Sequence, residues 1–130
     1  MNKARLLLVD DNDLLVESLS IPLRAAGYDV HTCSDGEAAL QMLGEVQPDI
    51  VVIDLLMPRR EGIETIIEIR RSHAEIGIIA MSGMAASGPV DFLRMAGEFG
   101  ADAWLRKPFT PKQLIALIED VAARRRPAPA

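Results

Sequence analysis

Acidic side chains stand directly after two apolar runs of the sequence. Asp10 and Asp11 follow the run LLLV, and Asp54 follows the run IVVI. Carboxylates that lie side by side repel one another, and burial strengthens the repulsion, so such a group usually has a positive partner. Mg²⁺ typically takes one or two carboxylates, waters and a phosphate oxygen. These residue types therefore predict half of a site for magnesium and a phosphoryl group, provided that the fold brings them together.

Two further polar side chains occupy similar places in the sequence. Ser82 ends a later apolar run, and Lys107 follows the last one. An ammonium group can neutralise part of the acidic charge, and a hydroxyl can bind a phosphate oxygen. The remaining acid of the first cluster is Asp13, which we expect to cap the following helix rather than to bind metal.

The elements that must position these side chains alternate along the chain. Apolar runs predict strands over residues 5–10, 28–33, 48–54, 76–82 and 102–105, and helical periodicity predicts helices over 13–27, 35–44, 62–73, 90–99 and 110–125. Asp35 and Thr110 are expected to begin helices, whereas Gly27 and Gly44 are expected to end them.

Five strands that alternate with five helices predict a doubly wound α/β fold with a parallel, flavodoxin-like sheet. The common strand order for such a chain is 2-1-3-4-5, which makes the first and third strands neighbours. Ligands bind beyond the carboxyl ends of the strands where the order reverses. The order therefore places Asp10, Asp11 and Asp54 at one edge of the sheet, with Ser82 and Lys107 beside them.

Length and composition indicate one domain. The chain has 130 residues, a net charge of -5 and one cysteine, so we expect no direct nucleic-acid binding, no internal disulfide and no thiol cluster for zinc. No apolar run approaches the roughly 20 residues that span a bilayer, so we expect a cytoplasmic protein without membrane insertion. Residues 1–122 are predicted to form the domain, and residues 123–130 a basic, Pro- and Ala-rich tail.

Four motifs carry a resemblance to a known family. VDDN, DLLMPRREG, AMS and GADAWLRKPF, in this order, resemble the receiver domain of bacterial two-component response regulators. The resemblance covers about residues 5–122 and indicates the single-domain type. Receivers are themselves an example of the 2-1-3-4-5 order.

The resemblance implies a role for each motif residue. Asp54 would be the phosphoacceptor, taking a phosphoryl group from a kinase phosphohistidine. Asp10, Asp11 and Asp54, together with the backbone carbonyl of Leu56, would hold Mg²⁺. Lys107 would neutralise charge on the phosphoryl oxygens.

The resemblance also implies a conformational switch. Ser82 would bond to a phosphoryl oxygen once Asp54 is modified and so draw in its loop. Trp104 occupies the place of the aromatic residue that turns inward as this loop moves. The peptide bond between Lys107 and Pro108 would be cis, which fixes the direction of the lysine.

The implied function is signal transduction in a phosphorelay rather than enzymatic turnover. The implied partners are a sensor histidine kinase or a histidine phosphotransfer protein, and a separate downstream target, with the receiver a monomer or a phosphorylation-dependent dimer. One alternative is a binding module of the same fold that works without phosphorylation, whose mark would be loss of an acid or of Lys107. Another is a Mg²⁺-dependent aspartyl phosphatase, which would need a second aspartate where this chain has Leu56.

Overall fold

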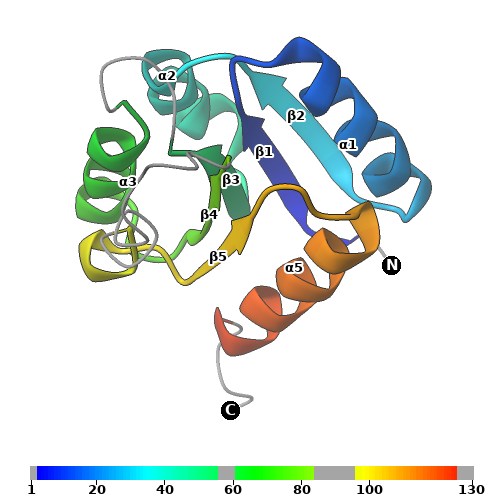
Figure 1. The fold of residues 1–130 in the computed structure, drawn as a ribbon. Coiled ribbons are helices and arrows are strands. Elements are labelled where there is room, and N and C mark those ends of the chain that lie inside the picture. Colours follow the sequence, from blue (N-terminus) through cyan, green and yellow to red (C-terminus); the bar gives the residue numbers. More distant parts are fainter. Residues whose placement is uncertain (1–2, 56–60, 84–95, 126–130) are drawn as a thin grey trace.

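The computed structural model describes residues 3–55, 61–83 and 96–125. Its strands form one parallel sheet with the order β2-β1-β3-β4-β5 (Figure 1). The strands are β1 (Arg5–Val9), β2 (Asp29–Cys33), β3 (Ile50–Asp54), β4 (Gly77–Ser82) and β5 (Ala103–Arg106). The predicted flavodoxin-like fold and its strand order are confirmed.

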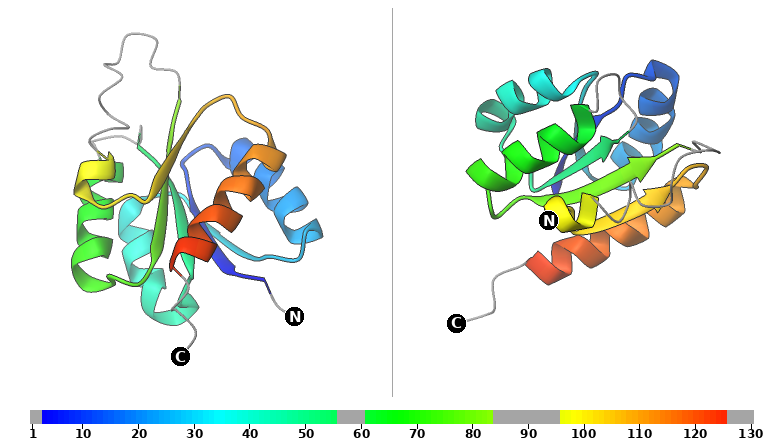
Figure 2. Two further views of the ribbon diagram at one scale, coloured as in Figure 1. Left: turned by 90° about the horizontal axis from the view of Figure 1, so that it is seen from below. Right: turned by 60° about the vertical axis from the view of Figure 1, so that its left-hand side comes forward.

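Helices cover both faces of the sheet. One face carries α1 (Asp13–Ala25) and α5 (Pro111–Arg125), and the other carries α2 (Gly36–Val46) and α3 (Glu61–Ser72) (Figures 1 and 2). Residues 96–99 are also helical and belong to the helix expected over 90–99, whose earlier residues lie outside the described part of the chain. None of the described helices is both long and apolar enough to cross a membrane.

Each face of the sheet packs its own apolar layer. Leu7, Val51 and Ile66 belong to the layer under α2 and α3, whereas Leu6 and Ile118 belong to the layer under α1 and α5. Successive strand residues point to opposite faces, so neighbouring leucines enter different layers. All residues of β3 and β4 are buried, as is typical of central parallel strands covered on both sides. These two strands therefore form a rigid support for the residues at their ends.

The first helix begins one residue earlier than its predicted cap implied. The side chain of Asn12 accepts a hydrogen bond of 3.2 Å from the backbone N–H of Leu15, so Asn12 is the N-cap. Asp13 is the first helical residue, where its negative charge complements the helix dipole. The prediction that Asp13 caps this helix was wrong. Asn and Asp are both preferred N-cap residues, and here Asn12 has the extended backbone conformation and accepts the capping hydrogen bond.

The second helix runs past Gly44, the residue predicted to end it. It continues to Val46, and Gln47 forms a left-handed C-terminal cap with a φ of 52°. Glycine inside a helix costs roughly 1 kcal/mol relative to alanine. Continuing the helix buries Val46, and burial of a valine side chain contributes about 1.5 kcal/mol or more. The prediction that Gly44 ends this helix was therefore wrong.

The predicted helix starts at Asp35 and Thr110 and the predicted end at Gly27 are confirmed. The Asp35 side chain accepts from the backbone N–H of Ala38 at 2.7 Å. Thr110 and Gln113 form a reciprocal capping box, each side chain accepting from the other residue's backbone N–H. Gly27 follows α1 with a φ of 100°, a conformation that favours glycine.

An ion-pair cluster closes the edge of the sheet opposite to the acidic residues. Asp102 accepts from the backbone N–H of Ile78 at 2.8 Å and pairs with Arg70 at 3.0 Å and Arg125 at 2.8 Å. Burial lowers the pKa of Arg70, and the nearby Arg125 lowers it further. The cluster ties α3 and α5 to the start of β5, the strand that leads to Lys107.

Candidate functional site

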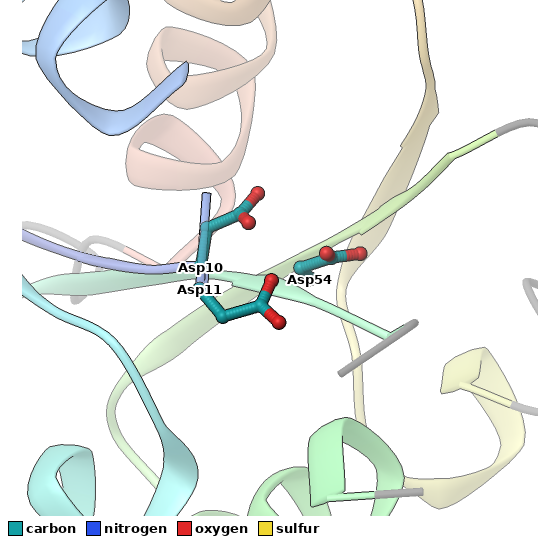
Figure 3. A group of neighbouring side chains, drawn as sticks. All are labelled: Asp10, Asp11 and Asp54. Atoms are coloured by element: carbon teal, nitrogen blue, oxygen red, sulfur yellow. The ribbon is translucent and has the colours of Figure 1, made fainter. Parts of the chain in front are cut away.

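Three carboxylates meet at the carboxyl edge of the sheet. Asp10 and Asp11 follow β1, and Asp54 ends β3. One carboxylate oxygen of each residue lies within 4.8 Å of the others, and Figure 3 shows the three side chains gathered at the ends of these two strands. The structure therefore brings together the three acids that the sequence placed at one edge.

The pairing of the central strands produces this convergence. β1 lies directly beside β3, with Val9 opposite Ile53, so the residues that follow β1 emerge next to Asp54. The backbone N–H of Asp10 also bonds to the carbonyl of Cys33 at the end of β2, at 3.2 Å. Main-chain bonds thus fix where the carboxylates project, independently of any metal.

The three acids differ in their access to water. Asp10 is 2% exposed and Asp54 is 4% exposed, whereas Asp11 is exposed at the surface. Buried carboxylates need a positive partner because desolvation makes their mutual repulsion more costly. Asp11 is therefore the member of the cluster that is most accessible to a cation from the solvent.

Lys107 is the positive partner that the structure supplies to the buried acids. Its Nζ lies 2.8 Å from Oδ2 of Asp10 and 3.4 Å from Oδ2 of Asp54. The peptide bond between Lys107 and Pro108 is cis, which is the geometry that the resemblance implied. The sequence placed Lys107 at this edge, but it did not predict the short bond to Asp10.

Asn12 is a site residue that sequence reasoning missed. Its backbone N–H donates to Oδ1 of Asp10 at 2.9 Å, while Lys107 holds the other oxygen of that carboxylate. An aspartate that accepts from the backbone two residues later is a common local turn, and this spacing is the signal that could have revealed it. The Asp10 side chain is thus fixed at both oxygens.

Ser82 ends β4 at the same edge of the sheet. It is buried, and its hydroxyl donates to the carbonyl of Gly83 at 3.0 Å. The backbone N–H of Lys107 donates to the carbonyl of Ser82 at 2.8 Å. This bond joins the residue that carries the hydroxyl to the residue that carries the ammonium group.

Trp104 lies on β5, the outer strand next to β4, and is 49% exposed. The edge of its indole ring lies against Gly97, where an added Cβ would come within 2.8 Å of the ring atom Cζ3. Leu56, whose carbonyl the resemblance assigned to the metal, lies outside the described residues.

The donor set fits a hard divalent cation. The cluster of Asp10, Asp11 and Asp54 offers only carboxylate oxygens, which Mg²⁺ prefers. Cys33 ends the neighbouring strand β2, but burial raises the pKa of its thiol to about 11. Cys33 is not a member of the cluster, whose three members are all aspartates.

Most of the chain matches the model of one known protein family. Residues 6–119 match the family model described as the response regulator receiver domain. The chain belongs to this family. As in other two-component systems, the receiver is a signalling domain, and the acidic cluster described above is the place where receivers bind Mg²⁺.

Relatives and solved structures agree with this assignment. The receiver is 35% identical over 125 residues to the alkaline phosphatase synthesis transcriptional regulatory protein PhoP of Bacillus subtilis, covering 95% of this chain and 50% of that protein. It is 35% identical over 128 residues to the DNA-binding response regulator MtrA of Mycolicibacterium smegmatis, covering 98% and 54%. The receiver thus spans about half the length of these curated relatives.

Among solved structures, the chemotaxis response regulator CheY4 of Vibrio cholerae is 29% identical, with a TM-score of 0.80 and coverage of 92% of this chain and 99% of that chain. A response regulator receiver domain protein from Clostridium thermocellum is 26% identical, with a TM-score of 0.85 and coverage of 95% and 97%. The receiver therefore matches nearly the whole of these two solved chains and about half of each of the two longer regulators.

Proposed function

We propose that this receiver accepts a phosphoryl group on Asp54 from the phosphohistidine of a sensor histidine kinase or a histidine phosphotransfer protein. The observation that carries the proposal is the position of Asp54, buried beside two further carboxylates and 3.4 Å from the Lys107 ammonium group. The receiver then signals in the cytoplasm through a conformational change that is read by a downstream partner, as a monomer or as a phosphorylation-dependent dimer.

The chemical step is a transfer between two nucleophiles. A carboxylate oxygen of Asp54 attacks phosphorus while the bond from phosphorus to the donor imidazole nitrogen breaks. The nitrogen keeps the electron pair and is protonated, and an acyl phosphate remains on Asp54. Phosphoryl transfer depends mainly on positioning and on charge neutralisation, and Lys107 can donate to a phosphoryl oxygen from its place beside Asp54.

Asp10, Asp11 and Asp54 would hold Mg²⁺, with the carbonyl of Leu56 as a further ligand. When bound, the ion neutralises charge on the phosphoryl oxygens. The exposed Asp11 would capture the cation, while Asp10 holds Lys107 in reach of the acceptor.

Magnesium is expected to stabilise the wild-type fold more than it stabilises Asp11→Ala. A ligand that binds only the native state contributes RT ln(1 + [L]/Kd), which is about 2.7 kcal/mol at 100 times Kd. Thermal unfolding with and without Mg²⁺ measures this gain. Loss of Asp11 removes one ligand, so the gain should fall by more than half. Asp13→Ala removes an equal charge outside the cluster and should keep the gain. Equal gains in wild type and Asp11→Ala would contradict the metal assignment.

Intact mass spectrometry tests the proposed reaction. The protein is incubated with Mg²⁺ and a small phosphodonor such as acetyl phosphate, and its mass is followed with time. The wild type should gain one phosphoryl group, and chelation of Mg²⁺ by EDTA should prevent the gain. A wild type that gains none with Mg²⁺ present would instead favour a binding module that works without phosphorylation.

Ser82 and Trp104 are proposed to convert phosphorylation into a change of surface. The hydroxyl of Ser82 would exchange the carbonyl of Gly83 for a phosphoryl oxygen, and Trp104 would turn toward the interior. Trp104 is the only tryptophan of the chain, so its fluorescence emission should shift to shorter wavelength on phosphorylation as the half-exposed ring loses water. Ser82→Ala, phosphorylated to the same extent by mass, should show a smaller shift. Unchanged emission in fully phosphorylated wild type would exclude Trp104 as the switch.

A further inference from the structure

We propose that Gly62 is a positioning residue for the phosphorylation of Asp54. Because Gly62 has no side chain, the first turn of α3 can rest directly on the main chain that carries the acceptor. This contact sets where the Asp54 carboxylate lies relative to Lys107 and the other acids. The inference rests on the proposed function and adds a residue that touches neither the phosphoryl group nor the cation.

The close approach at Gly62 involves main-chain atoms only. A Cβ added there would lie 2.5 Å from the carbonyl oxygen of Asp54 and 2.7 Å from Cα of Leu55. Ordinary van der Waals contact begins near 3.4 Å. At Gly97, by contrast, the nearest atoms belong to the Trp104 side chain, which has rotatable bonds. A side chain at position 62 would therefore force either α3 or the peptide after Asp54 to move by about 0.9 Å.

Neither partner can move without a cost. Asp54 is paired in register with Met81 of β4, and the next residue, Leu55, donates its backbone N–H to the carbonyl of Met81 at 2.8 Å. On the other side, α3 packs into the core through Ile66 and Ile69, which are fully buried. The displacement would be shared between the helix and the peptide that carries the acceptor, so the Asp54 carboxylate would shift.

Such a shift matters because phosphoryl transfer depends on the positions of the reacting and charge-neutralising groups relative to one another. Asp54 lies 3.4 Å from Nζ of Lys107, and its oxygen lies within 4.8 Å of those of Asp10 and Asp11. A displacement of about 1 Å in a reacting group can slow a reaction by about 100-fold. The expected consequence of a methyl group at position 62 is slow phosphorylation in a protein that still folds.

The test compares Gly62→Ala with Gly44→Ala in the full chain. Gly44 lies inside α2, and an added Cβ there meets nothing within 4 Å, so the same chemical change is made without a clash. Acetyl phosphate and Mg²⁺ are varied, and the rate of mass gain is measured well below the unfolding temperature. Gly62→Ala should lower the maximal rate by 10- to 100-fold. Gly44→Ala should stay within about twofold of the wild type.

A second control separates positioning from loss of stability. Ile69→Val loosens α3 at a buried position, typically at a cost of about 0.5–1.5 kcal/mol, without adding an atom near Asp54. Ile69→Val should be phosphorylated at the wild-type rate. If Gly62→Ala unfolds in buffer, all variants are compared in trimethylamine N-oxide, which favours the folded state, after circular dichroism shows that each is folded.

Magnesium affinity gives a readout apart from phosphorylation. The apparent Kd for Mg²⁺, obtained from thermal unfolding, should rise several-fold in Gly62→Ala because one ligand is displaced, and it should be unchanged in Ile69→Val. A wild-type maximal rate in Gly62→Ala, or an equal loss in Ile69→Val, would overturn the inference while leaving the proposed function intact. A wild type that takes no phosphoryl group would overturn both.

Discussion

Asp54→Asn is expected to gain no phosphoryl group under conditions in which the wild type gains one. The amide has almost the same shape as the carboxylate, but it lacks the negative oxygen that attacks phosphorus. The substitution also removes one of three like charges at a buried position, so the variant should fold at least as well as the wild type in the absence of Mg²⁺. Intact mass and thermal unfolding measure the two effects on the same samples.

Asp13→Asn is the matched control for this experiment. It makes the same chemical change at an exposed residue in the first turn of α1, outside the acidic cluster. This variant should be phosphorylated like the wild type. Undiminished labelling of Asp54→Asn would remove Asp54 from the role of acceptor, whatever the control does.

Lys107→Ala is expected to slow phosphorylation by about 100- to 1,000-fold, the usual cost of deleting one donor that stabilises transition-state charge. The variant also leaves Asp10 and Asp54 without the ammonium group that lies 2.8 and 3.4 Å from them. Its unfolding temperature without Mg²⁺ should therefore fall. The gain in stability on adding Mg²⁺ should be larger than in the wild type, because the cation then meets a site with more uncompensated negative charge.

Lys112→Ala removes an exposed lysine of α5 and should change neither measurement. Lys107→Arg keeps the positive charge but replaces a compact ammonium group with a larger, planar guanidinium group. This variant should therefore be phosphorylated at a rate between those of the wild type and Lys107→Ala. A rate for Lys107→Ala within twofold of the wild type would show that the ammonium group does not act on the phosphoryl group.

The buried strands could be predicted because every residue along the buried part of such a strand is apolar. The residues from Ile50 to Ile53 are all apolar, and a strand covered on both faces requires this. The helix ends at Asp13 and Gly44 could not be fixed in the same way, since each depends on a choice between near-equal alternatives. Asn12 and Asp13 are both good caps, and the burial of Val46 decided whether α2 continued.

The site could be predicted as far as topology determines it. Strand order alone brings Asp10 and Asp54 to one edge, because β1 and β3 are neighbours. The bond between Lys107 and Asp10 joins residues 97 positions apart, and no sequence pattern gives a distance across such a separation. The contact between Gly62 and the Asp54 carbonyl likewise depends on how closely α3 approaches β3, which only the packed structure shows.

Chemical trapping of the modified residue tests the central claim most directly. Borohydride reduces an acyl phosphate to an alcohol and so converts a phosphorylated aspartate to homoserine, which peptide mass spectrometry can locate. After incubation of the wild type with Mg²⁺ and acetyl phosphate, homoserine is expected at position 54, with aspartate unchanged at positions 10 and 11. Homoserine at position 10 or 11, or unmodified Asp54 in protein whose intact mass has gained a phosphoryl group, would contradict the assignment of Asp54 as the acceptor.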